Sequence, residues 1–445
     1  MSFRNIESYF NDVAALLDRS VAAREMYTCS LDAEISDFVR LNRGKVRQPG
    51  TVTQCYLRLH LIDGRKHAEQ CLTLSGDLAQ DRAPIASALS ALRDTIAALP
   101  EDPHLNFATD VRTSRVTRST PLPVAEEVVE TVLAAADGLD LVGIYAGGPV
   151  YRGFANSLGQ RNWHEVRSFN LQWSLYHRAD KAVKTSYGGF AWIPEAFAAK
   201  MTDARERLSL LTVRSRSLKP GRYRAYLTPT AMEEIAGMLC WGGFSGRALE
   251  TRQSCLFRLK DGAAVLDPSV AFAENTAEGI APAFQDDGFA RPDAVPLVTG
   301  GRMAGSLVSP RTAREFALAQ NGANASEMPE SLDMAAGDLD ATDALAALDT
   351  GLYIGNLWYL NFSDRPACRL TGMTRFASFW VESGKIVAPV DVMRFDDSVF
   401  RLLGEQLVGL TAERELLVNG DTYRQRNVSS MRLPGAVVRD MAFTL

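Results

Sequence analysis

The segment LTGMTRFASFWVESGKIVAPV, residues 370–390, predicts two short strands joined by a tight turn. Ser383-Gly384 supplies the turn, because glycine reaches the backbone conformations that a short hairpin loop requires. Arg375 lies in the first strand between a threonine and a phenylalanine, where a half-buried strand favours an apolar side chain. One interpretation is an ordinary strand-edge arginine that pairs with a neighbouring carboxylate, for which Glu233 and Glu234 are candidates.

The second half of the chain, which contains this hairpin, is predicted to be rich in strands. Alternating apolar residues predict a short strand over 222–227 and another over 352–360. Helices are expected from about Thr230 and over 341–349, and Asp261-Gly262 is a second hairpin signal. Residues 274–306 carry no clear period and are expected to be loops.

The first half of the chain mixes helices with strands. Apolar residues at helical spacing predict helices over 6–21, 85–99, 123–138 and 197–211. Alternating residues predict a hairpin over 51–76 that turns at Asp63-Gly64, and strands over 141–145 and 163–176. Residues 101–122 are polar and irregular, which is typical of a connector.

The best domain boundary is the charged, aperiodic run RSRSLKPG at 214–221. It divides the chain into an N-terminal α+β domain, 1–215, and a β-rich C-terminal domain, 216–445. The N-terminal domain would comprise a helix-hairpin part over 1–100 and a second part over 120–215. Strands clustered with helices, rather than in strict βαβ alternation, indicate the α+β fold class.

Composition excludes several classes of protein. The chain has 445 residues and a formal net charge of −5, which offers no bulk basic surface to nucleic acid and makes direct nucleic-acid binding an unfavoured prediction. No stretch approaches the roughly 20 apolar residues of a membrane span, and the N-terminus does not resemble a signal peptide. The six cysteines lack CxxC spacing, so we expect free thiols and a cytoplasmic location.

Common catalytic and cofactor motifs are missing from the sequence. It contains no GxxxxGK[ST] phosphate loop and no GxGxxG after a strand. Ser245 lies in GGFSG, which lacks the spacing of a nucleophile elbow, and no histidine base can be assigned to it. The segment WHEVRSF, 163–169, begins a histidine motif but does not complete HExxH. We therefore assign no catalytic residue.

One histidine pair stands out among the five histidines. A two-residue turn at Asp63-Gly64 would place His60 directly opposite His67, about 5 Å apart and close enough to share a metal ion. The same register puts Cys55 and Cys71 on opposite faces, which disfavours a disulfide between them. Two exposed histidines on a solvated hairpin are the favoured interpretation.

Four segments, taken in order, resemble the TldD/PmbA family, also called the modulator of DNA gyrase family. They are RGFANSLG at 152–159, PGRYRAYLTPTAMEEIAGML at 220–239, QDDGFARPDAVPLVTGGRMAGSLVSPRTA at 285–313, and DTGLYIGNLWYLNF with the 370–390 segment at 349–390. The resemblance implies a two-domain TldD/PmbA-type fold with a strand-rich C-terminal domain. It is strongest over about 140–400.

The resemblance also suggests where this chain departs from the zinc-binding members. TldD-type members carry HExxxH on a helix and a cysteine on a C-terminal strand, whereas PmbA/TldE-type members lack these ligands and pair with a TldD-type chain. Here the corresponding helix, 230–243, has no histidine. Arg375 falls near the position of the zinc cysteine, and a guanidinium repels Zn²⁺. Glu233, Glu234 and Arg375 are thus a candidate degenerate metal locus, with no metal ligand and no cofactor expected in this chain.

Three functional hypotheses follow, and the first is favoured. The chain would be a non-metallated PmbA/TldE-like subunit of a metallopeptidase that acts on unfolded peptides, with zinc only in its TldD-type partner. Asn156, Ser157, Trp358 and Tyr359 are the candidate peptide-binding residues. The alternative is a homodimeric regulatory or binding protein without proteolytic activity. The third is a self-sufficient hydrolase with an unrecognised site or with zinc at His60 and His67.

Overall fold

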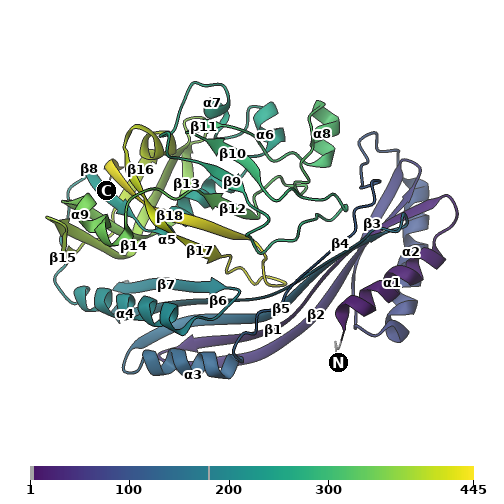
Figure 1. The fold of residues 1–445 in the computed structure, drawn as a ribbon, viewed down its shortest axis with the longest axis horizontal. Helices are drawn as coiled ribbons and strands as arrows, with labels where there is room; N and C mark the ends of the chain where they lie inside the picture. The colour runs from purple at the N-terminus through teal and green to yellow at the C-terminus, as the bar shows by residue number, and fades with distance from the viewer. Residues whose placement is uncertain (1–4, 179–180, 445) are drawn as a thin grey trace.

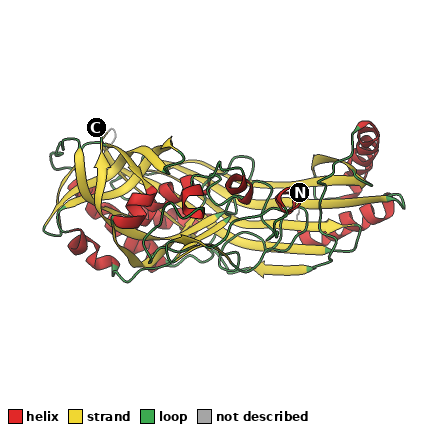
Figure 2. Cartoon of the chain, turned by 90° about the horizontal axis from the view of Figure 1, so that it is seen from above, coloured by secondary structure: helices red, strands yellow, loops and turns green. Residues whose placement is uncertain are grey.

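Two large β-sheets organise the chain in a computed structural model that describes residues 5–178 and 181–444. The first sheet is long and extends well beyond the C-terminal domain, which lies over one of its ends (Figure 1). Seen from above, the molecule is elongated, with the two N-terminal helices at the far end of the sheet (Figure 2). None of the helices in these described parts is long and apolar enough to cross a membrane.

The N-terminal sheet has seven strands, in the order β3-β2-β1-β5-β6-β4 with β7 paired to β6. The strands are β1 (Glu25–Asn42), β2 (Lys45–Asp63), β3 (Lys66–Thr73), β4 (Ser114–Arg118), β5 (Asp140–Asn156), β6 (Arg161–Arg178) and β7 (Lys181–Gly189). The helices are α1 (Ile6–Ser20), α2 (Leu78–Ala98), α3 (Ala125–Ala135) and α4 (Pro194–Leu210). Helices α3 and α4 pack against one face of the sheet (Figure 1), and α4 also contacts the C-terminal domain, where Lys200 lies 2.8 Å from Glu415.

The C-terminal sheet has eleven strands and includes two parallel pairs, β13 with β8 and β12 with β18. The strands are β8 (Gly221–Leu227), β9 (Phe272–Glu274), β10 (Val295–Thr299), β11 (Arg302–Met303), β12 (Ser331–Met334), β13 (Gly351–Asp364), β14 (Arg369–Glu382), β15 (Lys385–Pro389), β16 (Arg394–Ser398), β17 (Leu407–Val418) and β18 (Ser430–Phe443). The helices are α5 (Pro229–Cys240), α6 (Gly246–Glu250), α7 (Phe257–Lys260), α8 (Pro310–Phe316) and α9 (Ala344–Leu348), with short turns η1 (Ala341–Asp343) and η2 (Arg401–Glu405). The α+β, strand-rich fold predicted from the sequence is confirmed.

Several local predictions were wrong. Residues 25–50 received no assignment, but they form β1 and the start of β2. The connector 101–122 contains β4, which pairs with β6, and the loop region 274–306 contains β10 and β11. Asp261-Gly262 closes α7 rather than a hairpin. β1 does carry a strand pattern, because apolar and polar residues alternate strictly from Tyr27 to Ile35. The polar residues of this pattern, such as Thr28 and Glu34, are buried as well.

The β2–β3 hairpin turns one residue later than predicted. Gly64 has a φ of 65° and takes the first turn position, so Asp63 pairs with Lys66. His60 consequently lies opposite Glu69 and not opposite His67. The two imidazoles still meet diagonally, because every pairing shifts by two residues and both rings stay on the same face of the sheet.

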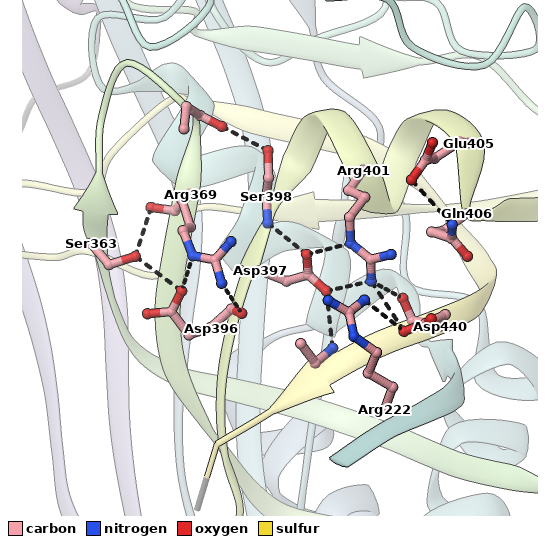
Figure 3. A network of polar contacts seen from close by, with 12 residues as sticks. Arg222, Ser363, Arg369, Asp396, Asp397, Ser398, Arg401, Glu405, Gln406 and Asp440 are labelled. Carbon is pink, nitrogen blue, oxygen red and sulfur yellow. Dashed lines mark hydrogen bonds and ion pairs between the residues drawn. The ribbon is translucent and has the colours of Figure 1, made fainter. Parts of the chain in front are cut away.

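A buried ion network holds the edge of the C-terminal domain (Figure 3). Asp397 on β16 accepts two hydrogen bonds from Arg401, each 2.9 Å long, and its side chain is only 1% exposed. Arg401 also reaches Asp440 on β18 at 3.1 Å, and Arg222 on β8 contacts the same carboxylate. Three strands are thereby tied together through a network that is buried at Asp397 and opens to solvent toward Arg222.

The loop between β17 and β18 joins the two domains. Arg426 in this loop is 4% exposed and donates hydrogen bonds to the carbonyl oxygens of Gly148 (2.9 Å) and Ser168 (2.7 Å) in the N-terminal sheet. Burial lowers the pKa of Arg426 to about 10, while the nearby Glu34 opposes this shift. The guanidinium thus remains charged at neutral pH and fixes the loop against the upper face of the sheet.

Candidate functional site

A cleft of about 560 Å³ lies where the two domains meet. Its walls come from α5, the middle of β13, the end of β17 with the following loop, and strands β6 and β7 of the N-terminal sheet. Four of the residues singled out in the sequence line it: Glu233, Glu234, Trp358 and Tyr359. The structure therefore brings the two carboxylates of the candidate degenerate locus and the candidate aromatic lining into one hollow, whereas Arg375 does not line it.

Helix α5 presents its two carboxylates to this cleft because of its capping and amphipathic pattern. Thr228 is the N-cap, with its hydroxyl accepting from the Ala231 amide at 3.2 Å, and Pro229 occupies the first turn. The apolar side of the helix packs into the C-terminal core through Met232, Ile235 and Leu239. The remaining side, which carries Glu233 and Glu234, faces the cleft.

The two carboxylates share an environment that disfavours their charge. Burial raises the pKa of Glu233 to about 7, and the adjacent Glu234 raises it further, while Lys184 on β7 opposes the shift. Burial also raises the pKa of Glu234, and Lys184 again acts in the opposite direction. At neutral pH Glu233 can therefore exchange a proton, and a cation placed beside it would favour the ionised form.

Arg375 stacks on an aromatic ring and does not reach a carboxylate. Its guanidinium carbon lies 4.1 Å from the centre of the Trp358 ring and 5.3 Å from that of Phe376. The interpretation that it pairs with Glu233 or Glu234 was wrong, since no such ion pair is formed within the described residues. The register explains this outcome: Arg375 lies opposite Asn356 on β13, so Trp358 is its diagonal neighbour.

The backbone around this stack is irregular on both strands. β13 and β14 shift register between Ile354 and Asn356 and again between Trp358 and Asn361. Tyr359 and Phe376 have φ values of 57° and 60°, a conformation that bulky residues adopt at a cost of about 1–3 kcal/mol. Tyr359 is 76% exposed as a result. Strain that presents an aromatic side chain to solvent beside a cleft is typical of a binding site.

Asn156 and Ser157 lie elsewhere in the molecule. Asn156 is 1% exposed and closes a turn, accepting from the amides of Leu158 and Gln160 at 3.0 Å each. The Ser157 amide donates to the Tyr27 carbonyl oxygen at 3.1 Å. Ile144 on the same strand β5 lies opposite the cleft residue Gln172, and the intervening 12 residues of strand span about 40 Å. The structure therefore does not bring this pair to the cleft.

The donor atoms on α5 do not fit a zinc ion. One turn after Glu233 and Glu234 stand Gly237 and Met238, so no second nitrogen or carboxylate ligand follows on the helix. Arg375 contributes a cation. Within residues 5–178 and 181–444, no three His, Cys, Asp or Glu side chains are placed to hold a metal ion.

The histidine pair and Ser245, which were also considered from the sequence, are hydrogen-bonded to other protein groups. His60 Nε2 lies 2.8 Å from His67 Nδ1, His67 Nε2 lies 3.3 Å from Asp102, and His60 Nδ1 lies 3.5 Å from the Thr28 hydroxyl, so all four ring nitrogens are already engaged with protein groups. Ser245 donates to Glu327 at 2.6 Å and caps α6, which gives its hydroxyl a structural role. All six cysteines are unbridged, with Cys55 buried and Cys71 exposed.

Several cleft residues could not be identified from the sequence. Gln172, Lys184, Asn419 and Gly420 also line the cleft, and they come from the N-terminal sheet and from the β17–β18 loop. An added Cβ on Gly420 would lie 2.3 Å from Gln172 Nε2, so a larger residue there would displace the end of the Gln172 side chain from its present position. Only the packing of the two domains shows that these residues belong to one site.

Solved structures share this architecture across nearly the whole chain. A candidate modulator of DNA gyrase from Thermotoga maritima matches with a TM-score of 0.77 and 14% identity, over 99% of this chain and all of that one. TldE from Thermococcus kodakarensis matches with a TM-score of 0.78 and 12% identity, over 98% and 100%. A candidate modulator of DNA gyrase from Bacteroides thetaiotaomicron matches with a TM-score of 0.71 and 14% identity, over 99% and 98%. These likenesses define the class of fold.

The family is identified by a match between the sequence and a protein-family model. The model of the PmbA/TldA metallopeptidase C-terminal domain matches residues 220–445, half of the chain. The chain belongs to the TldD/PmbA family. No curated protein matches it.

Proposed function

We propose that this chain is a metal-free, TldE-like subunit that works with a zinc-bearing TldD-type partner in a peptidase for unfolded peptides. In this proposal the partner supplies the zinc and the hydrolytic chemistry. This chain supplies part of the surface that holds the substrate. Its six unbridged cysteines accord with a reducing cytoplasm, where we place it.

One observation supports the metal-free assignment: the locus on α5 offers carboxylates and a stacked arginine in place of a zinc ligand set. Structural or catalytic zinc requires three or four convergent nitrogen, sulfur or carboxylate ligands. Glu233 and Glu234 are neighbours on one helix with no ligand a turn away, and Arg375 holds its charge over Trp358. We therefore derive no zinc chemistry from this chain.

The exposed edge of β13 is the surface that we propose for an extended peptide. β8 pairs with β13 only at Leu352–Ile354, and no other described strand pairs with that edge farther along. A free edge of this kind accepts a further strand through main-chain hydrogen bonds, which are indifferent to side-chain sequence. Trp358 and Tyr359 lie on this part of β13 and would contact alternate side chains of the peptide.

The proposal is tested by affinity purification of the tagged chain from its native host, followed by zinc analysis. We expect a co-purifying family member that carries HExxxH, with zinc in the complex and not in this chain alone. Cleavage of an unfolded peptide should require both chains. A matched control is the partner with its HExxxH histidines replaced, which should assemble normally but neither bind zinc nor cleave.

Three results would contradict the proposal. Stoichiometric zinc in the isolated chain would contradict the metal-free assignment. Recovery of a homodimer alone, with no cleavage in any mixture, would instead favour a regulatory or binding protein. Cleavage by the isolated chain would indicate a self-sufficient hydrolase.

A further inference from the structure

The cleft continues into a second hollow of about 550 Å³ on the upper face of the N-terminal sheet. The two hollows share Gln172 and Lys184, so together they form one groove. The groove runs from α5, across β6 and β5, to β1 and β2. The groove is therefore much longer than the cleft that contains Glu233 and Glu234.

The strand register explains why the groove side chains point the same way. Arg40 on β1 pairs with Ile144 on β5, and Ile144 pairs with Gln172 on β6, which gives one continuous row across three strands. Their sequence neighbours, including Leu41 and Trp173, point to the opposite face and pack in the core beneath α3 and α4. Because side chains alternate along a strand, the row with Arg40 must face the groove.

Charge is distributed unevenly along the groove. Arg40, Arg47 and Lys184 line the second hollow, and no aspartate or glutamate does so. No carboxylate lies within 4.0 Å of these three cations in the described part of the chain, although arginines elsewhere, such as Arg152 with Asp32, are paired. Beyond Lys184 the charge of the lining residues changes from positive to negative, because Glu233 and Glu234 form the wall at the other end of the groove.

We infer that the groove selects an extended polypeptide segment that carries carboxylates toward one end. Its acidic residues would lie over Arg40 and Arg47, and its uncharged or basic part would lie beside Glu233 and Glu234. This inference rests on the proposed peptide-holding function and adds a substrate class and a direction of binding. Charge complementarity of this kind fixes register as well as affinity.

The dimensions of the sheet set the spacing of the acidic residues. Neighbouring strands lie about 4.8 Å apart, so β6 and β2 are separated by about 14 Å. An extended peptide advances about 3.3 Å per residue, so its carboxylates should lie roughly four residues from the position that contacts Gln172. A peptide with acidic residues at that spacing should bind more tightly than one without them.

A nucleic acid fits the same groove poorly. Single-stranded nucleic acid carries a negative charge on every nucleotide, so a strand long enough to fill the groove would place phosphates beside Glu233 and Glu234. A polypeptide can be acidic at one end and neutral at the other. The reversal of charge along the groove therefore favours the peptide.

The test is fluorescence anisotropy with labelled unfolded peptides and the full-length chain, alone and with its partner. One peptide carries three glutamates at one end, and its matched control carries glutamines there. The variant is Arg40→Gln with Arg47→Gln, two exposed positions whose replacement leaves the core intact. The control variant is Arg302→Gln with Arg439→Gln, which changes net charge equally at exposed sites outside the groove.

We expect the acidic peptide to bind the native chain more tightly than the glutamine peptide. Each exposed ion pair is worth roughly two- to fivefold in affinity, so the groove variant should lose about 5- to 20-fold for the acidic peptide. The same variant should lose less than about twofold for the glutamine peptide. The control variant should bind both peptides as the native chain does.

Other outcomes overturn the inference in distinguishable ways. Equal affinity for the two peptides, or an equal loss in both variants, refutes the charge selection but leaves the peptide-holding role intact. Tighter binding of a single-stranded oligonucleotide, weakened by the groove variant, would replace the peptide with nucleic acid. If neither peptide binds, alone or with the partner, the proposed peptide-holding function itself fails.

Discussion

Replacing Glu233 by glutamine should stabilise the protein above neutral pH. In the folded chain, burial and the neighbouring Glu234 raise the pKa of Glu233 to about 7, whereas the unfolded chain has the ordinary value near 4.5. Between these two values the folded state binds more protons than the unfolded state, so the free energy of unfolding falls as pH rises. The loss is complete once pH exceeds the folded pKa.

The size of the change in the free energy of unfolding follows from the pKa shift of Glu233. One pKa unit corresponds to about 1.4 kcal/mol, so a shift of this size has an upper limit of about 3 kcal/mol. The cleft admits water to part of the side chain, and Lys184 compensates part of the charge, so about 1–3 kcal/mol is expected. Glutamine keeps the size of the side chain and removes the charge, so E233Q should recover this amount at about pH 8 and almost none at about pH 4, below the pKa of the unfolded chain.

The assay is urea unfolding of E233Q and the native chain across this pH range, followed by both tryptophan fluorescence and circular dichroism. Coincident transitions are required before free energies are compared. Burial also raises the pKa of Glu274 to about 7 and that of Asp287 to about 6, so only the difference between variant and native chain isolates Glu233. Exposed Glu101→Gln serves as the control. A difference that does not change with pH would refute the reasoning.

Three further changes have expected outcomes. Asp397→Asn should lower the free energy of unfolding by about 1.5–3 kcal/mol, because it removes the charged acceptor of two hydrogen bonds from Arg401, which keeps only Asp440 as an ion-pair partner; an unchanged urea midpoint would contradict this. Asn156→Ala should destabilise by about 1–2 kcal/mol through the loss of its turn hydrogen bonds, yet leave peptide affinity unchanged, and a loss of peptide affinity would restore its predicted binding role. Gly420→Ala should weaken peptide binding several-fold with little change in stability, since the new Cβ displaces only the flexible end of Gln172; unaltered anisotropy would show that Gln172 is not a contact.

The sequence predicted those parts of the fold whose pattern is local. The hairpin of β14 and β15, the helix at 341–349 and the opening helix all appear within a few residues of their expected limits, because turn residues and helical spacing identify them. β1 and β4 were missed for different reasons. β1 has a local signal that the prediction did not use, the alternation of apolar and polar residues from Tyr27 to Ile35. β4 is a five-residue strand within polar sequence that pairs in parallel with the distant β6.

The candidate site was predictable only where the chemistry lies on one element. Glu233 and Glu234 come from a single helix, and Trp358 and Tyr359 come from a single strand, so each pair could be identified before their contact was known. Their convergence required the two sheets to be placed together. The cationic end of the groove depends on the pairing of β1, β5 and β6, which connects residues more than a hundred positions apart.

Arg375 was recognised from the sequence as an unusual residue for a strand, but its partner in the structure differs from the expected one. An arginine inside a strand needs compensation, and a carboxylate was the simplest expectation. The register shift after Ile354 instead places Trp358 diagonally across from it, and the face of an indole attracts a guanidinium without neutralising its charge. The stack orients Trp358 beside the two carboxylates of α5, so Arg375 contributes to the shape of the groove wall through this ring.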